Sequence, residues 1–476
     1  MNPHWNSFWN RKLSRRELLR TSSAGFGSVA LLGLLAEQAE AKARHARPDP
    51  LAPKQPMFPP HAKRVIFVFL HGGPSQVDTF DRKPLLDRDH GKPLPFDKPR
   101  IVSSQTGNLL KSPWEFHHCG RSGIEVSELF PHVGACIDDL CVINSMYASN
   151  SRHGGALLEL HTGSDTFVRP SMGSWITYGL GTENQSLPGF ITVCPTLTHG
   201  GVNNWSSAFL PAAYQGTPIG NASISSEQAK IPFIQNTETP REVQRIELDL
   251  MNEMNRDGLA KAGPDPALEG RINALELAFR MQMAAPELQE ITGETDATRK
   301  LYGLDDAKTR NFGRQCLMAR RFSERGVRFV QVTHSYKWDQ HSDLRRDHAS
   351  NAMEVDKPIA GLLRDLKSRG LLDDTIVLIG GEFGRTPCAQ GTDGRDHNPQ
   401  GFTMLLAGGG LKTGIKYGKT DDYGYYAVED MVHVHDLHAT MLHLLGIDHK
   451  RLTYKYAGRD FRLTDVSGNV VKGILA

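Results

Sequence analysis

The stretch GGEFGRTPCAQGTDGRDHNPQG, residues 380–401, places four chemically capable side chains among glycines and a proline: Glu382, Arg385, Asp396 and His397. Carboxylate oxygens and imidazole nitrogens bind borderline divalent ions such as zinc or manganese, and a guanidinium binds anions. The stretch is typical of a loop between two apolar runs, and loops at the ends of buried strands commonly carry sites. The alternative is a surface loop in which Glu382 and Arg385 form a solvated ion pair worth about 0–1 kcal/mol.

Similar polar side chains occur at the ends of other apolar runs. They are His71, Ser75, Asp78 and Asp81 after residues 64–70, Ser149, Ser151, Arg152 and His153 after residues 140–146, and His334, Asp339, His341 and Asp343 at the end of residues 326–334 or beyond. The carboxyl ends of parallel strands share one edge of a sheet, where such folds bind ligands. A single histidine of this kind is more often structural than a ligand, but several groups converging on one edge predict a metal or anion site.

Six apolar runs are typical of the buried strands that would position these groups: residues 64–70, 140–146, 189–195, 326–334, 375–381 and 402–409. Helical patterns lie between and after them, at residues 154–163, 269–283, 307–326, 351–370 and 432–447. This alternation predicts an α/β fold, a doubly wound and mostly parallel sheet with helices on both faces. The polar and more helical region of about residues 200–320 is predicted to be a helical insertion packed on the sheet.

The first 43 residues have the features of an export signal. A charged NRKLSRRELLR segment precedes an uncharged run of 16 residues, TSSAGFGSVALLGLLA, and Ala-x-Ala cleavage sites follow. The run is short for a membrane span, and the Arg15-Arg16 pair in SRRELL resembles a twin-arginine signal. An uncleaved anchor or a chance arginine pair is the alternative. Residues 1–43 are therefore predicted to engage the twin-arginine translocase, leaving a periplasmic or secreted mature chain without a stable membrane span.

The rest of the chain is predicted to be an extended tether, residues 44–63 with six prolines, and one large domain, residues 64–476. The 55 Lys+Arg against 53 Asp+Glu give no sign of a nucleic-acid partner. The six cysteines include no C-x-x-C pair, which argues against a structural zinc site built on such pairs. Cys136 and Cys141 either form a bridge after export or remain free and buried.

Several motifs follow one another in a characteristic order: FLHGGPSQVDTFDRKP, RPSMGSWITYGLG, LPAAYQGTP, WDQHSD, RGLLDDTIVLIGGEFGRTP and GRDHNPQGFTMLLAGGGLKTG. From about Arg64 to the C-terminus this ordered set resembles the exported family called domain of unknown function 1501, which is placed in the alkaline-phosphatase-like superfamily near the sulfatases. The resemblance implies an alkaline-phosphatase-like doubly wound fold, a divalent-metal site and a nucleophile on a loop before a helix. It also implies hydrolysis of phosphate or sulfate esters.

The resemblance also implies a set of metal ligands by position. They are His71 or Asp78 after the first strand, Asp339 and His341 after a middle strand, Glu382 after the next, and the late His397 with Asp396 beside it. The implied cofactor is a divalent ion, either zinc, manganese, calcium or magnesium.

The chain departs from the superfamily pattern in three places. Asp339 and His341 are two residues apart, whereas in alkaline phosphatases the pair is four residues apart, a place that Asp343 occupies here. Glu382-Phe383 stands where relatives have Asp-His or Asp-Asn, so one ligand is missing, and Phe383 is expected to point away from the site. The sulfatase motif Cys-x-Pro-Ser-Arg is absent. These departures argue against a two-metal mechanism and against a formylglycine sulfatase.

The leading hypothesis is an exported, metal-dependent hydrolase of sulfate or phosphate esters, with sulfated or phosphorylated glycans among its candidate substrates. Ser151 would be the nucleophile, His153 an acid or base, and Arg152 and Arg385 would hold the anion. The alternative is a non-catalytic relative that keeps the fold and binds an anionic glycan. An exported structural protein is a third class, which no feature of the sequence supports. Metal content separates the first two, because a hydrolase should retain about one or two divalent ions per chain.

Overall fold

The computed structural model describes residues 49–98, 106–231, 234, 236, 238–263 and 265–476. The predicted signal peptide, residues 1–43, lies outside the described residues, as do residues 44–48 of the predicted tether. The described part of that tether, residues 50–63, belongs to the same compact unit as the rest of the chain. It is hydrogen-bonded to this unit, because the His61 N–H donates to the Leu444 carbonyl at 2.8 Å.

A nine-stranded central sheet organises the chain, and all six strands predicted from apolar runs belong to it. In chain order its strands are β1 (Arg64–Leu70), β4 (Leu140–Tyr147), β5 (Phe190–Val193), β6 (Thr217–Ile219), β7 (Phe329–His334), β8 (Thr375–Gly380), β11 (Phe402–Ala407), β12 (Ile415–Tyr417) and β15 (Val432–His433). The spatial order is β12-β4-β11-β8-β1-β7-β5-β6, and β15 also pairs with β4.

All pairings in this sheet are parallel except those of β11, which runs antiparallel to both β8 and β4. The predicted α/β fold with a mostly parallel sheet is thus confirmed. The reversal of β11 has a consequence for the site. The segment that precedes β11, and not the one that follows it, lies at the edge where the parallel strands end.

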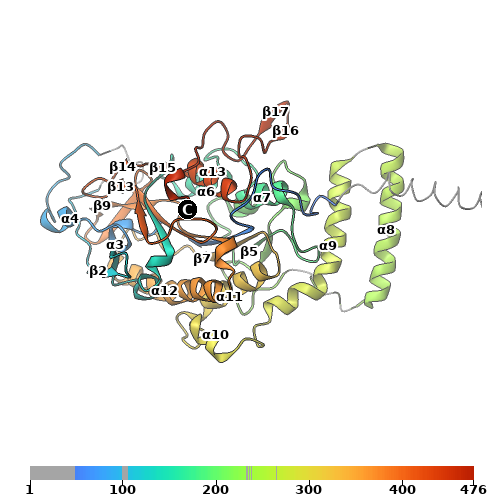
Figure 1. Cartoon of the computed structure of the whole chain (residues 1–476), viewed down its shortest axis with the longest axis horizontal. Helices are drawn as coiled ribbons and strands as arrows, with labels where there is room; N and C mark the ends of the chain where they lie inside the picture. Colours follow the sequence, from blue (N-terminus) through green and yellow to red (C-terminus); the bar gives the residue numbers. More distant parts are fainter. Residues whose placement is uncertain (1–48, 99–105, 232–233, 235, 237, 264) are drawn as a thin grey trace, which may run out of the picture. The chain divides into compact units, whose positions relative to one another are not determined.

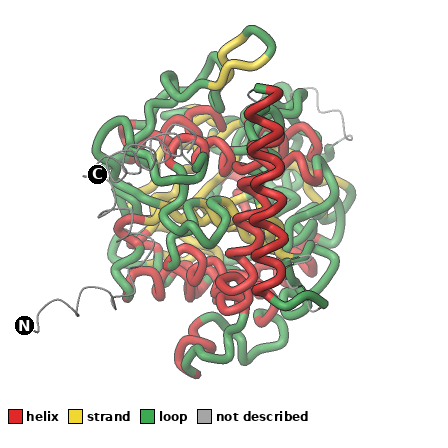
Figure 2. The backbone as a smooth tube through the Cα atoms, turned by 90° about the vertical axis from the view of Figure 1, so that its right-hand side faces the viewer, coloured by secondary structure: helices red, strands yellow, loops and turns green. Residues whose placement is uncertain are grey.

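Helices cover both faces of the sheet (Figures 1 and 2). The α-helices of the described chain are α3 (Gln76–Thr79), α4 (Pro84–Arg88), α5 (Pro131–Gly134), α6 (His153–Thr162), α7 (Met172–Leu180), α8 (Arg241–Ala262), α9 (Pro266–Gln289), α10 (Asp296–Leu301), α11 (Arg310–Glu324), α12 (Leu344–Ser368) and α13 (Val434–Leu444). In Figure 1, α11 and α12 lie below the sheet and α6, α7 and α13 lie above it.

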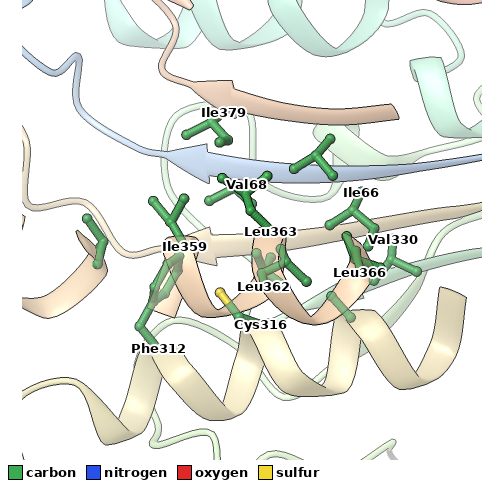
Figure 3. Close-up of a cluster of buried hydrophobic side chains, with 14 of the residues drawn as sticks. Ile66, Val68, Phe312, Cys316, Val330, Ile359, Leu362, Leu363, Leu366 and Ile379 are labelled. Atoms are coloured by element: carbon green, nitrogen blue, oxygen red, sulfur yellow. The ribbon is translucent and has the colours of Figure 1, made fainter. Parts of the chain in front are cut away.

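The alternation of side chains along β1 divides the core into two layers. Ile66 and Val68 pack into one buried cluster with residues of α11 and α12, including Cys316 and Leu362 (Figure 3). Phe67 and its alternate neighbours pack into the other cluster, with residues of α6, α7 and α13. Each large apolar side chain buried in this way contributes roughly 1.5–3 kcal/mol. A strand buried on both faces explains why residues 65–70 are apolar throughout.

The prediction that residues 380–401 form a loop is wrong for most of that stretch. β9 (Gly384–Gln390) and β10 (Gly394–Asn398) form an antiparallel hairpin, with His397 opposite Arg385. Its residues are mostly buried despite their polarity. The smaller hairpins are β2 (Phe116–Cys119) with β3 (Ile124–Ser127), β13 (Lys419–Thr420) with β14 (Ala427–Glu429), and β16 (Tyr454–Tyr456) with β17 (Arg459–Phe461).

The region of about residues 200–320 contains α8, α9 and α10, but it also supplies the edge strand β6 and most of α11. Helix α8 packs along α9 through an ion pair of 2.8 Å between Arg245 Nη2 and Glu276 Oε1. All six cysteines are free thiols, so Cys136 and Cys141 form no bridge. Among the described residues, no helix combines the length and apolar character needed to cross a bilayer.

Candidate metal centre

Asp339 lies at the centre of a cluster at the carboxyl edge of the sheet. Its Oδ1 lies 2.6 Å from Arg385 Nη2, 2.9 Å from His341 Nε2, 3.0 Å from His397 Nε2 and 3.3 Å from His153 Nε2. Burial raises the pKa of Asp339, but hydrogen bonds from the three histidines and the Arg385 charge outweigh it and hold the pKa far below its usual range. The carboxylate therefore remains ionised and acts as an acceptor only.

The loop after β1 brings His71 to this cluster. Gly72, at φ 118°, passes so close to the loop after β7 that a Cβ would lie 2.8 Å from the backbone nitrogen of Asp339. A side chain at this position would thus separate the two loops. His71 itself is completely buried, and this burial lowers the pKa of its imidazole to about 4.

Glu382 contacts the cluster through His153 and the backbone of Gly72. Its two carboxylate oxygens each accept the Gly72 N–H at 3.1 Å, and Oε1 accepts from His153 Nδ1 at 2.7 Å. Burial raises the pKa of Glu382, but the His153 bond and nearby positive charge outweigh it, and the pKa is lowered to about 2. Because an ionised carboxylate cannot donate, His153 must carry its proton on Nδ1. This contact directs the other nitrogen, Nε2, towards Asp339.

The ring of His397 is oriented in the same way. Its Nδ1 donates to the Ser151 carbonyl at 2.7 Å, which leaves Nε2 facing Asp339. A histidine that ligates a metal commonly donates its other N–H to a carboxylate or a backbone carbonyl. Both His153 and His397 show this pattern. A lone pair on Nε2 that faces a carboxylate oxygen requires a proton or a cation between them.

Three overlapping groups of side chains have ligand atoms that lie within 4.8 Å of one another: His153, Asp339 and His397; His341, Asp396 and His397; and His71, His153 and His199. The first two groups consist of predicted site residues. Asp339, His341, Asp396 and His397 will be called the carboxylate–histidine group. Two carboxylates and two imidazoles form a donor set that suits zinc or manganese.

The charges in the carboxylate–histidine group also fit a cation. Asp396 is fully buried, and Asp339 is mostly buried beside the single guanidinium of Arg385. A hydrogen bond with Asp339 raises the pKa of His341, whereas burial lowers the pKa of His397. Further positive charge for Asp339 thus comes from protons on the histidines or from a metal ion that displaces them.

His199 belongs to the cluster but is absent from the residues predicted from the sequence. It lies after β5, at the same edge of the sheet, with φ 50°, and it is followed by Gly200 and Gly201. Its Nδ1 lies 3.4 Å from His71 Nε2. The sequence signal that could have identified His199 is its place after the third apolar run, residues 189–195.

Tyr336, also absent from the prediction, covers the histidines. Its ring centre lies 4.7 Å from those of His71 and His199 and 5.1 Å from that of His153. Its hydroxyl donates to Asp339 Oδ2. The ring is 39% exposed and therefore lies between the buried histidines and solvent.

Arg385 was expected to bind substrate, but the structure places it differently. The side chain is only 1% exposed, and its guanidinium donates to the carbonyls of Gly73, Arg395 and Trp338 at 2.9, 3.2 and 3.0 Å, in addition to Asp339. It therefore ties together three loops and does not face solvent.

Phe383 does not point away from the site, as expected. Its ring stacks on His397 with centres 4.5 Å apart and packs against His153 at 4.9 Å. That expectation assumed that residues 380–387 form a turn without tertiary contacts, in which neighbouring side chains point in opposite directions. Instead Gly73 approaches the ring so closely that a Cβ would lie 2.6 Å from it. The ring thus forms one apolar wall of the cluster.

Asp78, predicted as a possible first ligand, does not join any of the three groups. Its oxygens accept from Arg395 Nε at 2.6 Å and Nη2 at 3.0 Å, and from the Ser75 hydroxyl at 2.5 Å. Asp78 and Arg395 are both completely buried. This bidentate pair joins the segment after β1 to the β9–β10 hairpin. Asp78 is therefore placed as a structural partner of the hairpin.

The loop before α6 carries the predicted nucleophile. The carbonyl of Ser151 accepts the His397 bond, and Arg152 is exposed at the N-cap of α6. The nearby Ser149 belongs to a different cluster, because its hydroxyl lies 3.3 Å from His433 Nε2. Of the two serines considered from the sequence, Ser151 is the one joined to the metal cluster.

The sequence profile of the family described as Protein of unknown function (DUF1501) matches residues 62–475. The chain belongs to this family. Among curated proteins, none matches the DUF1501 chain.

Solved structures overlap with the DUF1501 chain at low identity. The lipoteichoic acid synthase LtaP from Listeria monocytogenes is 10% identical with a TM-score of 0.37, covering 88% of this chain and 79% of that one. Alkaline phosphatase from the Antarctic bacterium TAB5 is 10% identical with a TM-score of 0.33, covering 81% and 98%. The PsFucS1 sulfatase from Pseudoalteromonas sp. is 12% identical with a TM-score of 0.36, covering 93% and 75%. Similarity at this level does not establish a shared activity.

Proposed function

We propose that the DUF1501 chain is an exported, metal-dependent hydrolase of sulfate or phosphate esters. The observation that carries this proposal is the carboxylate–histidine group, in which Asp339, His341, Asp396 and His397 offer two carboxylates and two imidazoles at the carboxyl edge of the sheet. When bound there, a divalent ion would polarise the ester oxygen and lower the pKa of the attacking hydroxyl or water.

The N-terminus of α6 supports an anionic substrate. The helix begins at His153, inside the cluster, and no side chain caps it. Its first N–H groups and the positive end of its dipole favour an anion. A Cβ on Gly154 would meet no atom within 4 Å, so the helix end is open at this residue, whereas the Asn150 side chain lies against Gly155. The exposed Arg152 lies beside it, and we assign to Arg152 the anion-binding role that Arg385 does not fill.

Ser151 is the proposed nucleophile because it directly precedes the α6 N-terminus and its backbone is held by His397. Tyr336 is partly exposed and its hydroxyl donates to Asp339, so it can exchange a proton with the leaving alcohol or with water. Phe383 and the buried Arg385 keep water from the inner side of the cluster. Each of these roles follows from the position of the residue relative to Asp339.

The experiment measures metal content and the hydrolysis of a panel of aryl sulfates, aryl phosphates and sulfated oligosaccharides. Ser151→Ala should abolish hydrolysis while metal content stays constant, and His341→Ala should lower both. Ser149→Ala is the matched control, because Ser149 contacts His433 outside the cluster. Equal loss of activity in both serine variants, or no hydrolysis of any ester by the metal-loaded protein, would reject the proposal.

One observation favours the alternative of a non-catalytic protein that binds anionic glycans. Among the described residues, no hydrogen bond joins the Ser151 hydroxyl to a base, so no activated nucleophile is preformed. On this alternative the metal-loaded protein would retain sulfated oligosaccharides without turning them over. The non-catalytic alternative would be supported if this binding depends on Arg152 and no sulfate or phosphate is released.

The exported location is part of the proposal and rests on the twin-arginine pattern alone. Replacing Arg15 and Arg16 with lysine should leave the precursor in the cytoplasm, because twin-arginine recognition distinguishes guanidinium from ammonium groups. Cell fractionation measures this, and unchanged export of the double variant would remove the assignment.

A further inference from the structure

We propose that His71, His153 and His199 form a separate site for a zinc-like divalent cation, in addition to the carboxylate–histidine group. These residues will be called the three-histidine group. Their ligand atoms lie within 4.8 Å of one another. The site does not depend on the proposed hydrolase activity, because it is argued only from the geometry of the three imidazoles. The three neutral imidazole nitrogens would bind a borderline cation and leave its fourth coordination position open.

The spacing of the nitrogens fits tetrahedral coordination. Ligand nitrogens at about 2.0–2.1 Å from a tetrahedral zinc ion lie about 3.3–3.4 Å apart. His71 Nε2 and His199 Nδ1 are 3.4 Å apart. The ring of His153 lies next to both, with its centre 4.9 Å from that of His199 and 6.2 Å from that of His71.

The nitrogens of His153 and His71 are placed to hold a cation. Glu382 Oε1 accepts from His153 Nδ1 at 2.7 Å, and His153 Nε2 faces the ionised Asp339 Oδ1 at 3.3 Å, so a cation on Nε2 can take the place of a proton. His71 is 0% exposed, and its Nδ1 makes no hydrogen bond within the described part of the chain. An unpaired buried polar group costs about 1–3 kcal/mol, so a buried imidazole of this kind is commonly found at a ligand site.

Three separate elements hold the donors in place. His71 directly follows β1, His153 is the first residue of α6, and His199 lies after β5. The backbone of His199 is in the left-handed region at φ 50°, which is uncommon for a residue with a Cβ. Such conformations cost of order 1–3 kcal/mol and persist where the surroundings hold them, commonly at ligand sites. Here the conformation brings the imidazole to His71.

The three-histidine group and the carboxylate–histidine group can be filled together. His153 also groups with Asp339 and His397, but when it is assigned to the first ion, His71 and His199 complete one set and Asp339, His341, Asp396 and His397 supply the other. His153 and Asp339 are neighbours, 3.3 Å apart, so the two ions would be adjacent. The sequence argument against two metals rested on the Asp339–His341 spacing and on Glu382-Phe383, and it did not include His199.

The test is metal stoichiometry in the full-length mature protein, loaded with Zn²⁺ and freed of excess metal by gel filtration. Wild type should retain two ions per chain, and His199→Ala and His341→Ala should each retain one. Loading His341→Ala with Co²⁺ should give the intense visible absorption of tetrahedral cobalt, and the same spectrum should be absent from the double variant His199→Ala with His341→Ala.

His117→Ala is the matched control, because His117 is exposed on β2 and belongs to none of the groups. Two retained ions in His199→Ala, or a tetrahedral cobalt spectrum that survives in the double variant, would overturn the proposal. If His199→Ala fails to fold, the cobalt spectrum of His341→Ala still decides, because its absence rejects the site. A protein that binds two ions but hydrolyses no ester would support this site and reject the hydrolase.

Discussion

Glu382 lies between two donors, the N–H of Gly72 at 3.1 Å and Nδ1 of His153 at 2.7 Å. The substitution Glu382→Gln replaces one oxygen with an NH₂ group, so a donor would then face a donor. Given the three-histidine group proposed above, we expect zinc affinity there to fall about 10–100-fold, as for other residues that orient a ligand. Calorimetric titration with Zn²⁺ in the His341→Ala background isolates this group. Unchanged affinity would show that Glu382 does not position His153.

The control for this substitution is Glu354→Gln. Glu354 also binds a histidine, His334, at 3.0 Å, but neither belongs to the metal groups. It should leave zinc affinity unchanged. Acid unfolding adds a second measurement, because the pKa of Glu382 is lowered to about 2. The carboxylate therefore contributes stability above its usual pKa of about 4.5. Wild type should lose that contribution as the pH falls towards 2, and Glu382→Gln should not.

At the scale of elements, the β9–β10 hairpin carries Asp396 and His397 to the cluster. Gly394 at the start of β10 lies against the loop after β7, and a Cβ there would clash with the His341 carbonyl. Gly394→Ala should therefore displace this loop, costing about 1–3 kcal/mol as an overpacked site and weakening metal binding by the carboxylate–histidine group. Urea unfolding and Zn²⁺ titration measure the two effects.

Gly258→Ala provides the comparison for Gly394. It lies in α8, and a Cβ there would meet no atom within 4 Å. This alanine should stabilise the helix by about 0.5–1 kcal/mol and leave metal binding unchanged. If Gly394→Ala behaves like Gly258→Ala, the close contact between the hairpin and the loop is not required for the site.

The same hairpin shows what could be predicted from the sequence and what could not. Strands such as β1 and β8 were found at their bounds because burial on both faces produces continuous apolar runs. The hairpin, GRTPCAQ and GRDHN, is polar and is buried through pairs such as Arg395–Asp78, which no local pattern reveals. The direction of β11 was also hidden, because strand polarity depends on pairing partners and not on composition.

The candidate site could likewise be predicted only in part from the sequence. The residue types at the ends of the strands predicted Asp339, His341, Asp396 and His397 among the ligands, and the structure places the ligand atoms of His341, Asp396 and His397 within 4.8 Å of one another and Asp339 3.0 Å from His397. Their roles depended on contacts between distant loops. Arg385 was expected to bind substrate because of its charge, yet it is buried against five acceptors.

At the scale of the whole molecule, the metal groups join segments that are far apart in the chain. The ligands run from His71 to His397, and they lie on the loops after β1, β5 and β7, at the start of α6 and on β10. An ion that binds only the folded state stabilises it by about 2.7 kcal/mol per site at a free concentration 100 times its dissociation constant. Two ions would therefore cross-link this edge of the sheet.

Chelation should accordingly lower the unfolding temperature of the wild-type protein, and added Zn²⁺ should restore it. The double variant His199→Ala with His341→Ala lacks one ligand of each group, so its unfolding temperature should be unaffected by EDTA. Each single variant should lose part of the stabilisation, because the two groups share no ligand. Differential scanning calorimetry measures all four proteins under one buffer. An equal response to EDTA in the wild type and the double variant would place the stabilising metal elsewhere in the chain.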